Sequence, residues 1–275
     1  MKPIMGQSDA IRRIDRSVST LATSDGPVCV YGERGTGKTL IAQTIHARDP
    51  GRAGQSLVVV HCATLPAGFT EGDKILALFE GAFQVARGGT LVLKEVPALS
   101  AAIQSLLHCA LKQHISADAG VRVIATASTD LVPLMQQGQF HTGLFHRLAG
   151  ITMTVPPLRK RKSDIPWLVA HFIGDLNVRY CRDIQGITPQ ALRILLKHDW
   201  PGNVQELKRC IEHAVLKTDR AVIDCPELED AINSMNGRGG FNSKVKRSPN
   251  GAFSPTTEGI ARGTGTGSEE MEQER

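Results

Sequence analysis

The first half of the chain alternates short apolar runs with stretches in which apolar residues recur every three or four positions. Runs of that length and branching are typical of buried strands, whereas the three-to-four spacing is typical of helices that cover a sheet. The strand-like runs are 27–31, 57–60, 90–96 and 121–127. The helix-like stretches begin at Ser8, span 40–46 and span about 98–114. This alternation predicts an α/β fold with a parallel sheet flanked by helices.

The second half shows helical patterns only, beginning after the basic stretch 156–162, P-P-L-R-K-R-K. The first helix is expected from Ser163, and the second from Thr188, a capping residue followed by proline. The third follows 200–203, and a short fourth follows Asp224. We therefore expect a small all-helical domain, with Trp167 and Trp200 in its core.

Glycine, serine, threonine and proline dominate the chain from residue 236 onward, and large apolar residues are sparse there. Such a segment buries too little surface to offset the entropy of ordering it, so a disordered tail is expected. The predicted division is thus an α/β core over 1–158, a helical domain over 159–235 and a tail over 236–275.

Composition adds little to this picture. The apolar fraction of 41% is enough for a core, and the formal charge of +5 is too small to argue for a nucleic-acid partner. The six cysteines show no C-x-x-C spacing, which favours free thiols over zinc or disulfides. No apolar run approaches about 18 residues, so we expect a soluble cytoplasmic protein with no membrane contact.

One motif in the sequence indicates a specific chemistry, the binding of phosphate. It fits G-x-x-x-x-G-K-[ST], the phosphate loop, and lies between a predicted strand and a predicted helix, which is the context that the motif requires. Its residues are Gly32, Glu33, Arg34, Gly35, Thr36, Gly37, Lys38 and Thr39. In such a loop backbone N–H groups surround a phosphate, the lysine contacts the β- and γ-phosphates, and the threonine hydroxyl ligates Mg²⁺. The expected cofactors are ATP and Mg²⁺.

Five further motifs follow the phosphate loop in a fixed order: G-G-T-L-x-L-x-E, V-R-V-I-A, F-x-x-x-L-x-x-R-L, P-P-L-R-x-R-x-x-D-I and W-P-G-N-V-x-E-L. In this order the chain, from about Ile4 to Val222, resembles the AAA+ domain of bacterial sigma-54-dependent transcription activators. The resemblance implies an α/β nucleotide-binding core, a helical lid and a ring, usually a hexamer. ATP would lie between neighbouring subunits, and its hydrolysis would remodel sigma-54 RNA polymerase. Glu95 matches the glutamate that polarises the attacking water, and Arg147 matches the arginine finger that reaches a neighbour's γ-phosphate.

The chain departs from this family pattern at the residue before Glu95. The family has aspartate there, which helps to fix the metal, and this chain has Lys94. A lysine replaces an anion by a cation beside the metal, which predicts impaired hydrolysis with nucleotide binding retained. Lys94 could also swing aside, or supplant Mg²⁺ by neutralising phosphate directly.

Four more positions weaken the catalytic electrostatics. The family's sensor asparagine falls on Ser128, and the asparagine that pairs with the glutamate falls on His61. The first of two arginines near the finger falls on His141, and the lid's sensor arginine falls on Gln205. Each change removes a group that would face the nucleotide or the catalytic glutamate.

The family's G-A-F-T-G-A loop, which contacts sigma-54, is also missing in our alignment of motifs. The tripeptide at 81–83 is G-A-F, but it fits the segment just before the strand at 90, and 66–80 is too short to hold the loop. No DNA-binding helix-turn-helix follows the lid, so direct DNA binding is not expected.

Three hypotheses follow. The first is a regulator that binds nucleotide and joins or tunes the ring of a homologous full-length activator, reaching sigma-54 RNA polymerase indirectly. The second is an active ATPase that works as a homo-oligomer. The third is a nucleic-acid-binding protein that uses the basic stretch 159–162 and the tail, for which no recognition motif argues.

Overall fold

The structure is a computed structural model of the 275-residue chain. It describes residues 4–65, 72–114 and 120–235. The tail over 236–275, for which the sequence predicts disorder, lies outside the described residues, and so does part of the stretch 66–80. The domain boundaries therefore stay predictions.

A five-stranded parallel sheet forms the centre of the α/β core, with the strand order β2-β3-β4-β1-β5. The strands are β1 (Val28–Tyr31), β2 (Leu57–His61), β3 (Thr90–Lys94), β4 (Arg122–Ala127) and β5 (Ile151–Thr154). The parallel sheet predicted from the sequence is confirmed. β5 was not predicted, because only one of its four residues is fully buried and its apolar run is short.

The strand at 57–60 was predicted to be buried, and that prediction is wrong. β2 is half-buried along most of its length and ends at the exposed His61. The reason is its place at the edge of the sheet, where it pairs with β3 alone. A branched apolar run cannot by itself distinguish an edge strand from a central one.

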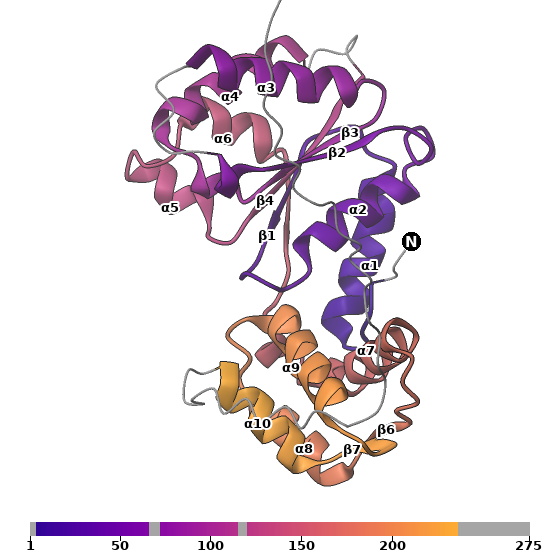
Figure 1. The fold of residues 1–275 in the computed structure, drawn as a ribbon. Coiled ribbons are helices and arrows are strands. Elements are labelled where there is room, and N and C mark those ends of the chain that lie inside the picture. The colour runs from indigo at the N-terminus through magenta and orange to yellow at the C-terminus, as the bar shows by residue number, and fades with distance from the viewer. Residues whose placement is uncertain (1–3, 66–71, 115–119, 236–275) are drawn as a thin grey trace, which may run out of the picture. The chain divides into compact units, whose positions relative to one another are not determined.

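Helices cover both faces of the sheet (Figure 1). One face packs against α1 (Asp9–Ala22) and α2 (Lys38–Arg48) through the row of Val28, Ile124 and Val92. The other face packs against further helices through alternate residues of the same strands. These helices are α3 (Gly72–Val85), α4 (Ala101–His114), α5 (Leu131–Gln136) and α6 (Thr142–Leu148).

The helical domain contains α7 (Ile165–Tyr180), α8 (Pro189–Lys197), α9 (Asn203–Lys217) and α10 (Cys225–Met235). Thr188 caps α8 as predicted, since its hydroxyl accepts a hydrogen bond from the Ala191 N–H at 3.2 Å. A two-residue parallel ladder of β6 (Gly186–Ile187) and β7 (Val222–Ile223) accompanies these helices and was not predicted.

The two tryptophans of the helical domain differ in burial. Trp200 is fully buried and its indole N–H donates to the carbonyl of Leu195, as a core residue should. Trp167 is 49% exposed, so its prediction as a core residue is wrong. It lies in the first turn of α7, which the sequence placed correctly, but on the outer side of that helix.

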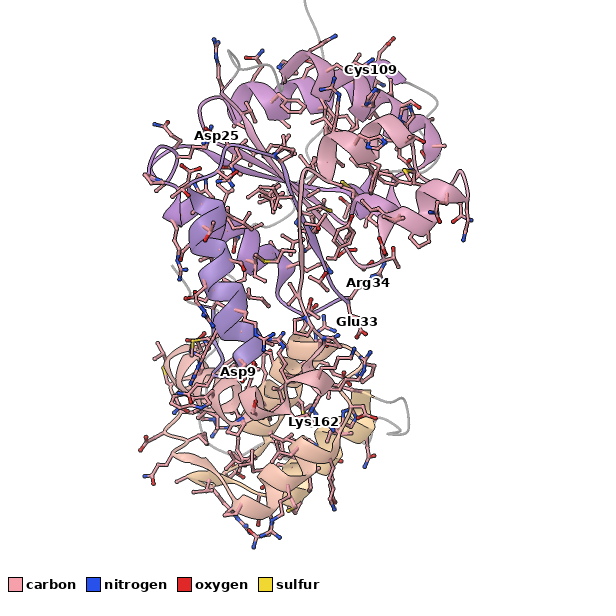
Figure 2. The ribbon with its side chains drawn as sticks, turned by 180° about the vertical axis from the view of Figure 1, so that it is seen from behind. Asp9, Asp25, Glu33, Arg34, Cys109 and Lys162 are labelled. Carbon is pink, nitrogen blue, oxygen red and sulfur yellow. The ribbon has the colours of Figure 1, made fainter. Side chains whose placement is uncertain are left out.

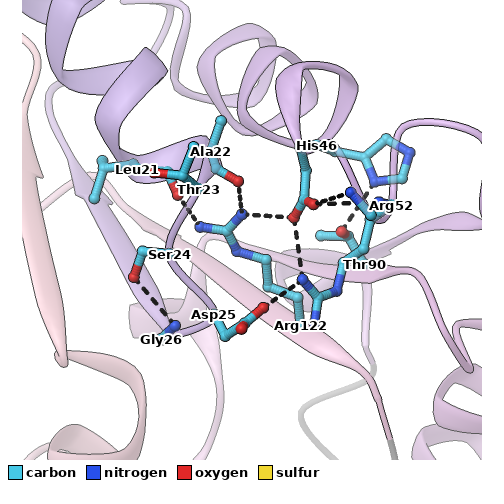
Figure 3. A network of polar contacts seen from close by, with 12 residues as sticks. Leu21, Ala22, Thr23, Ser24, Asp25, Gly26, His46, Arg52, Thr90 and Arg122 are labelled. Atoms are coloured by element: carbon cyan, nitrogen blue, oxygen red, sulfur yellow. Dashed lines mark hydrogen bonds and ion pairs between the residues drawn. The ribbon is translucent and has the colours of Figure 1, made fainter.

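A buried ionic network joins the amino end of β4 to the two helices on that face (Figure 3). The Arg122 guanidinium donates to the carbonyl oxygens of Leu21 and Ala22, in the last turn of α1. It also pairs with Asp49 at 2.9 Å, directly after α2, and Arg52 bonds the same carboxylate at 3.2 Å. The cation thus satisfies carbonyls that the end of a helix leaves unpaired.

The described helices include none that is both long and apolar enough to cross a membrane.

Candidate functional site

The phosphate loop connects β1 to α2, as the sequence predicts. The Gly32 N–H donates to the carbonyl of Ala127 at 3.1 Å, which ties the start of the loop to β4. Gly37 caps α2 with φ of 104°, and Gly35 has φ of 77°. Residues with side chains rarely adopt these conformations, so glycine lets the loop curl with its N–H groups around one point at the helix N-terminus.

Lys38 is almost completely buried, with 5% of its surface exposed, and its ammonium turns back onto the loop. It donates to the carbonyl oxygens of Gly32 at 2.7 Å and Glu33 at 3.1 Å. It also pairs with Oε1 of Glu95 at 2.9 Å. All three ammonium donors are therefore engaged, and the structure brings together two residues that the sequence predicted for the site.

Glu95 follows β3 directly and adopts a left-handed conformation with φ of 60°. Its N–H donates to the Thr126 hydroxyl at 3.0 Å. Burial opposes ionisation of its carboxyl, but hydrogen bonds with Lys38 and Ser128 outweigh burial, so the pKa of Glu95 lies below its ordinary value. A carboxylate held in this way is a weaker proton acceptor than a free one. Ser128, at the sensor position, thus contacts the glutamate itself.

Lys94 is the last residue of β3 and is half-buried. It lies opposite His61 in the register of β2 and β3. Within the described part of the chain, no hydrogen bond or ion pair is recorded for its ammonium. No hydrogen bond or ion pair is recorded between the His61 imidazole and Glu95 in those residues either, so His61 does not take over the pairing expected of the asparagine.

Thr39 was predicted to ligate Mg²⁺. Its hydroxyl lies in the first turn of α2 and has no recorded hydrogen bond to another described residue, which suits a ligand. Protein-bound Mg²⁺ beside phosphate is usually held by one or two carboxylates as well. Here the carboxylate at hand, Glu95, is engaged by Lys38, and the neighbouring side chain is a lysine. The described residues contain no group of three or more acidic, histidine or cysteine side chains that could hold a metal. The residues around Thr39 therefore do not form a set of ligands that would hold Mg²⁺ firmly.

The start of α9 docks against the phosphate loop. The Asn203 side chain is fully buried and donates to the Arg34 carbonyl at 2.9 Å and to the Glu33 carboxylate at 3.2 Å. Its own oxygen accepts from the Leu158 N–H at 2.8 Å. Asn203 therefore holds the loop, the segment before the helical domain and α9 in one arrangement.

Gly35 shows how closely that docking fits. A Cβ atom added at Gly35 would lie 2.1 Å from the carbonyl oxygen of Gly202, nearer than any real contact. The Gln205 N–H donates to the Gly35 carbonyl at 3.3 Å. The Gln205 side chain, which occupies the lid's sensor position, is exposed.

A salt bridge lies on the exposed side of the loop. Arg159 pairs with Glu33 through two hydrogen bonds, of 2.7 and 2.5 Å. The hydrogen bonds from Arg159 and Asn203 lower the pKa of Glu33 to about 2. Figure 2 shows Glu33 and Arg34 beside one another at the tip of the loop.

A cleft lies on the other side of the loop. Its walls are mostly apolar and come from the N-terminal segment, α1, α2, α7 and α9. The lining residues are Ile4, Met5, Ile11, Thr36, Gly37, Leu40, Ile41, Val155, Arg161, Leu168, His171, Phe172, Val204 and Lys208. An apolar cleft beside a phosphate loop can hold a flat heterocycle attached to the phosphates.

Asp164 holds the N-terminal wall of that cleft. It is fully buried and accepts from the N–H groups of Gln7 and Ser8, both at 2.7 Å, and from the Ser8 hydroxyl at 2.8 Å. A Cβ atom at Gly6 would lie 2.8 Å from the Asp164 carboxyl carbon, so glycine is needed there. These bonds place Ile4 and Met5 over the cleft.

Arg161 forms part of the opposite wall. It is 5% exposed, donates to the Thr36 carbonyl at 2.9 Å and lies 3.9 Å from Asp164. Burial lowers the pKa of its guanidinium, while the charge of Asp164 opposes that shift. Its Nε has no hydrogen-bond partner among the described residues. The second arginine of P-P-L-R-x-R thus connects the loop to the cleft.

Arg147 lies on α6, and the structure records no hydrogen bond or ion pair that joins it to Lys38 or Glu95. No ion pair or hydrogen bond is recorded for it among the described residues. His141 caps the same helix, because its Nδ1 accepts from the Leu144 N–H at 3.1 Å. The centroid of the His141 ring lies 4.8 Å from that of His108 on α4, with the two rings tilted by 34°. His141, at the position of the family's first arginine, therefore caps α6.

The tripeptide at 81–83 does not form a loop. It lies inside α3, and the Phe83 side chain is only 1% exposed and stacks on His114. A phenylalanine buried in this way cannot present itself to another protein.

Two family models together match nearly all of the described chain. The model described as the sigma-54 interaction domain matches residues 5–158, and the AAA+ ATPase lid domain matches residues 159–243. The chain belongs to the sigma-54 interaction domain family. The resemblance seen in the sequence motifs is confirmed, and so is the AAA+ fold with its helical lid.

Curated and solved relatives agree with this assignment. The transcriptional regulatory protein ZraR of Klebsiella oxytoca is 35% identical over 252 residues, which are 83% of this chain and 56% of that protein. NtrX from Brucella abortus in complex with ADP gives a TM-score of 0.75 at 27% identity, over 84% of this chain and 56% of that one. The same protein with ATP gives 0.74 at 27% identity, over 86% and 58%. This sigma-54 interaction chain thus spans little more than half the length of these relatives.

Proposed function

We propose that this chain binds an adenine nucleotide at its phosphate loop, hydrolyses it poorly and acts by joining the ring of a complete sigma-54-dependent activator. The observation that carries the proposal is an intact loop beside an altered catalytic strand. The loop keeps its glycines, Lys38 and Thr39, whereas the strand next to it ends in Lys94.

The nucleotide would span the loop and the apolar cleft beside it. Its phosphates would accept hydrogen bonds from the loop N–H groups and from Lys38, whose ammonium would exchange a loop carbonyl for phosphate and keep its pairing with Glu95. Its base would enter the cleft between the N-terminal segment and α7. The NtrX structures in complex with ADP and ATP support nucleotide binding by a chain of this fold.

Hydrolysis would be slow for two reasons. Glu95 has a lowered pKa, so it is a poor acceptor for a proton of the attacking water. Lys94 stands where a carboxylate would orient a metal, and a point-charge ammonium cannot template in-line attack as a metal does. The carboxylate and the arginine proposed for catalysis are Glu95 and Arg147.

Ring assembly would explain why Arg147 remains while other catalytic groups are changed. It is half-buried and has no recorded partner in the described residues, so it is available to a nucleotide bound by a neighbouring subunit. The chain would then serve a complete activator through Arg147 without turning over its own nucleotide. The partner would supply the contact with sigma-54, because 81–83 lies inside α3.

The alternative is an active homo-oligomeric ATPase. Glu95, Lys38 and Arg147 favour it, since they are the groups that turnover in this family would need. The two functions differ in whether the chain alone releases phosphate.

The test is phosphate release from ATP with Mg²⁺, measured over a range of protein concentrations. Lys38→Ala serves as the blank, Lys94→Asp as the repair and Lys112→Asp, at an exposed position on α4, as the matched charge control. We expect no release by the parent, bound nucleotide in equilibrium dialysis and gain of release in Lys94→Asp alone. Release that rises cooperatively with parent concentration would establish the alternative.

Ring joining is tested by mixing the chain with a purified full-length sigma-54 activator from the same genome. We expect one mixed complex in light scattering and a change in the activator's phosphate release. Arg147→Ala should abolish that change, whereas Arg209→Ala, on an exposed part of α9, should not. A chain that stays monomeric in the mixture would contradict the proposal.

A further inference from the structure

The position of Lys94 follows from the register of the sheet. Two residues earlier, Val92 packs in the cluster that contains Ile41 and Ile45 of α2. Because side chains alternate along a strand, Lys94 projects to the same face, the one that α2 covers. α2 begins at the phosphate loop, where the carboxyl ends of the parallel strands meet. Lys94 therefore stands beneath the loop.

The neighbouring Glu95 fixes how near the loop Lys94 lies. Glu95 is next to Lys94 in the chain, and its carboxylate is 2.9 Å from the Lys38 ammonium. A lysine carries its charge on four flexible methylenes, so its ammonium can move toward a ligand at the loop. No hydrogen bond or ion pair recorded for the described residues holds it elsewhere.

The charges around the loop are unbalanced. Lys38, Lys94 and Arg34 are positive, and the N-terminus of α2 adds a partial positive charge. The carboxylates of Glu95 and Glu33 are already paired, with Lys38 and Arg159 respectively. Lys94 is thus a half-buried cation in need of an anion, at a site whose backbone is shaped for phosphate.

The same charge disfavours a divalent metal. Mg²⁺ beside the phosphates would share this end of the sheet with the Lys94 ammonium, which repels it, and the adjacent carboxylate of Glu95 is paired with Lys38. The Lys94 ammonium can neutralise phosphate charge without a set of carboxylate ligands. Lys94 and Mg²⁺ would therefore compete for the same place beside a bound polyphosphate.

We infer that this chain binds nucleoside diphosphates and triphosphates without a divalent cation, with the Lys94 ammonium supplying the charge that Mg²⁺ would otherwise supply. The inference rests on the proposed nucleotide binding and deepens it. It also gives the chain a nucleotide-bound state that does not depend on magnesium.

The experiment is an equilibrium titration of the full chain with fluorescent analogues of ADP and ATP, once in excess Mg²⁺ and once in excess EDTA. We expect the same Kd in both conditions. Lys94→Met keeps the length of the side chain without its charge, and should weaken binding in EDTA by about tenfold, as loss of a charge-assisted contact does. Lys94→Asp should bind weakly in EDTA and regain affinity when Mg²⁺ is added.

The controls separate the two proposals. Lys38→Ala is the blank, and Lys112→Met removes a positive charge from an exposed turn of α4 far from the loop in sequence. Absence of binding by the parent in both conditions would refute nucleotide binding itself. Binding by the parent in Mg²⁺ alone would overturn the inference and leave nucleotide binding standing. Binding by Lys94→Met in EDTA as tight as the parent's would also overturn it. The comparison of the parent with and without EDTA needs no variant, so a misfolded variant does not remove the test.

Discussion

The two ends of the sheet differ in whether their buried charges have partners within the protein. At the amino ends of the strands, Arg122 pairs with Asp49, which also pairs with Arg52, and the two terminal nitrogens of Arg122 donate to carbonyls at the end of α1 (Figure 3). At the carboxyl ends, Lys38 pairs with Glu95, but the adjacent Lys94 has no recorded partner in the described residues.

The difference separates a structural site from a binding site. Removing a charge from water is costly, and the cost is recovered only where a partner is fixed by the fold. The amino end contains its own partners, because two helices and a strand bring them together. The carboxyl end carries an excess of positive charge and backbone N–H groups, so its missing partner is an anionic ligand.

The largest expected effect tests the amino end. Arg122→Met keeps the length of the side chain but leaves the Asp49 carboxylate with Arg52 as its one remaining cation, and leaves the carbonyls of Leu21 and Ala22 without the guanidinium donor. Breaking a buried ion pair in this way should lower the free energy of unfolding by about 3–5 kcal/mol. Urea unfolding followed by circular dichroism measures it.

The matched control is Arg209→Met, at an exposed position on α9. A change there should alter the free energy of unfolding by at most about 0.5 kcal/mol. Equal effects of the two variants would show that the Arg122 network does not stabilise the fold, and the contrast between the two ends would disappear.

A smaller effect is expected at the carboxyl end. Asn203→Ala removes the hydrogen bonds to Arg34, Glu33 and Leu158, and its backbone φ of 56° suits asparagine better than alanine. We expect a loss of roughly 2 kcal/mol in the free energy of unfolding, together with weaker nucleotide binding, because the loop loses its anchor. Thermal unfolding and nucleotide titration measure the two quantities.

Asn203→Gly separates the backbone from the side chain, since glycine accepts the positive φ but forms none of the bonds. Compared with Asn203→Ala, Asn203→Gly should recover part of the free energy of unfolding and none of the nucleotide affinity. Gln205→Ala, on the exposed side of α9, is the control for stability. Full nucleotide affinity in both Asn203 variants would argue against the loop anchor.

The smallest effect concerns the exposed salt bridge. The hydrogen bond from Arg159 is the main reason why the pKa of Glu33 is about 2 instead of 4.5. Because the folded pKa is depressed, the stabilising contribution of the bridge is present above pH 4.5 and is lost as the pH falls toward 2. Arg159→Gln should raise the pKa of Glu33 toward its ordinary value, as a carbon-detected NMR titration would measure.

At neutral pH the same variant should lower the urea concentration at the midpoint of unfolding only slightly, because solvent screens an exposed pair. Lys160→Gln, next in the chain, should shift the pKa of Glu33 much less, since Lys160 acts on it through its charge alone. An unchanged pKa of Glu33 in Arg159→Gln would show that the bridge does not form in solution.

The sequence by itself determined the parallel sheet, the phosphate loop and the helical lid. These features depend on local signals: apolar runs of strand length, the glycines around Lys38, and a threonine followed by proline at the start of α8. Each signal lies within one element, so it can be recognised without knowledge of the rest of the chain. The order of the motifs then gave the family.

Tertiary structure alone decided which distant residues build the site. Asn203 contacts Glu33 from 170 residues away, and Asp164 holds the N-terminal segment from a comparable distance. It also decided that β2 lies at an edge and that Trp167 is exposed. Periodicity reports which side of an element is apolar, but not which other element will lie beside it. The partners of Lys38, Glu95 and Ser128, and the lack of one for Lys94 among the described residues, follow from that packing.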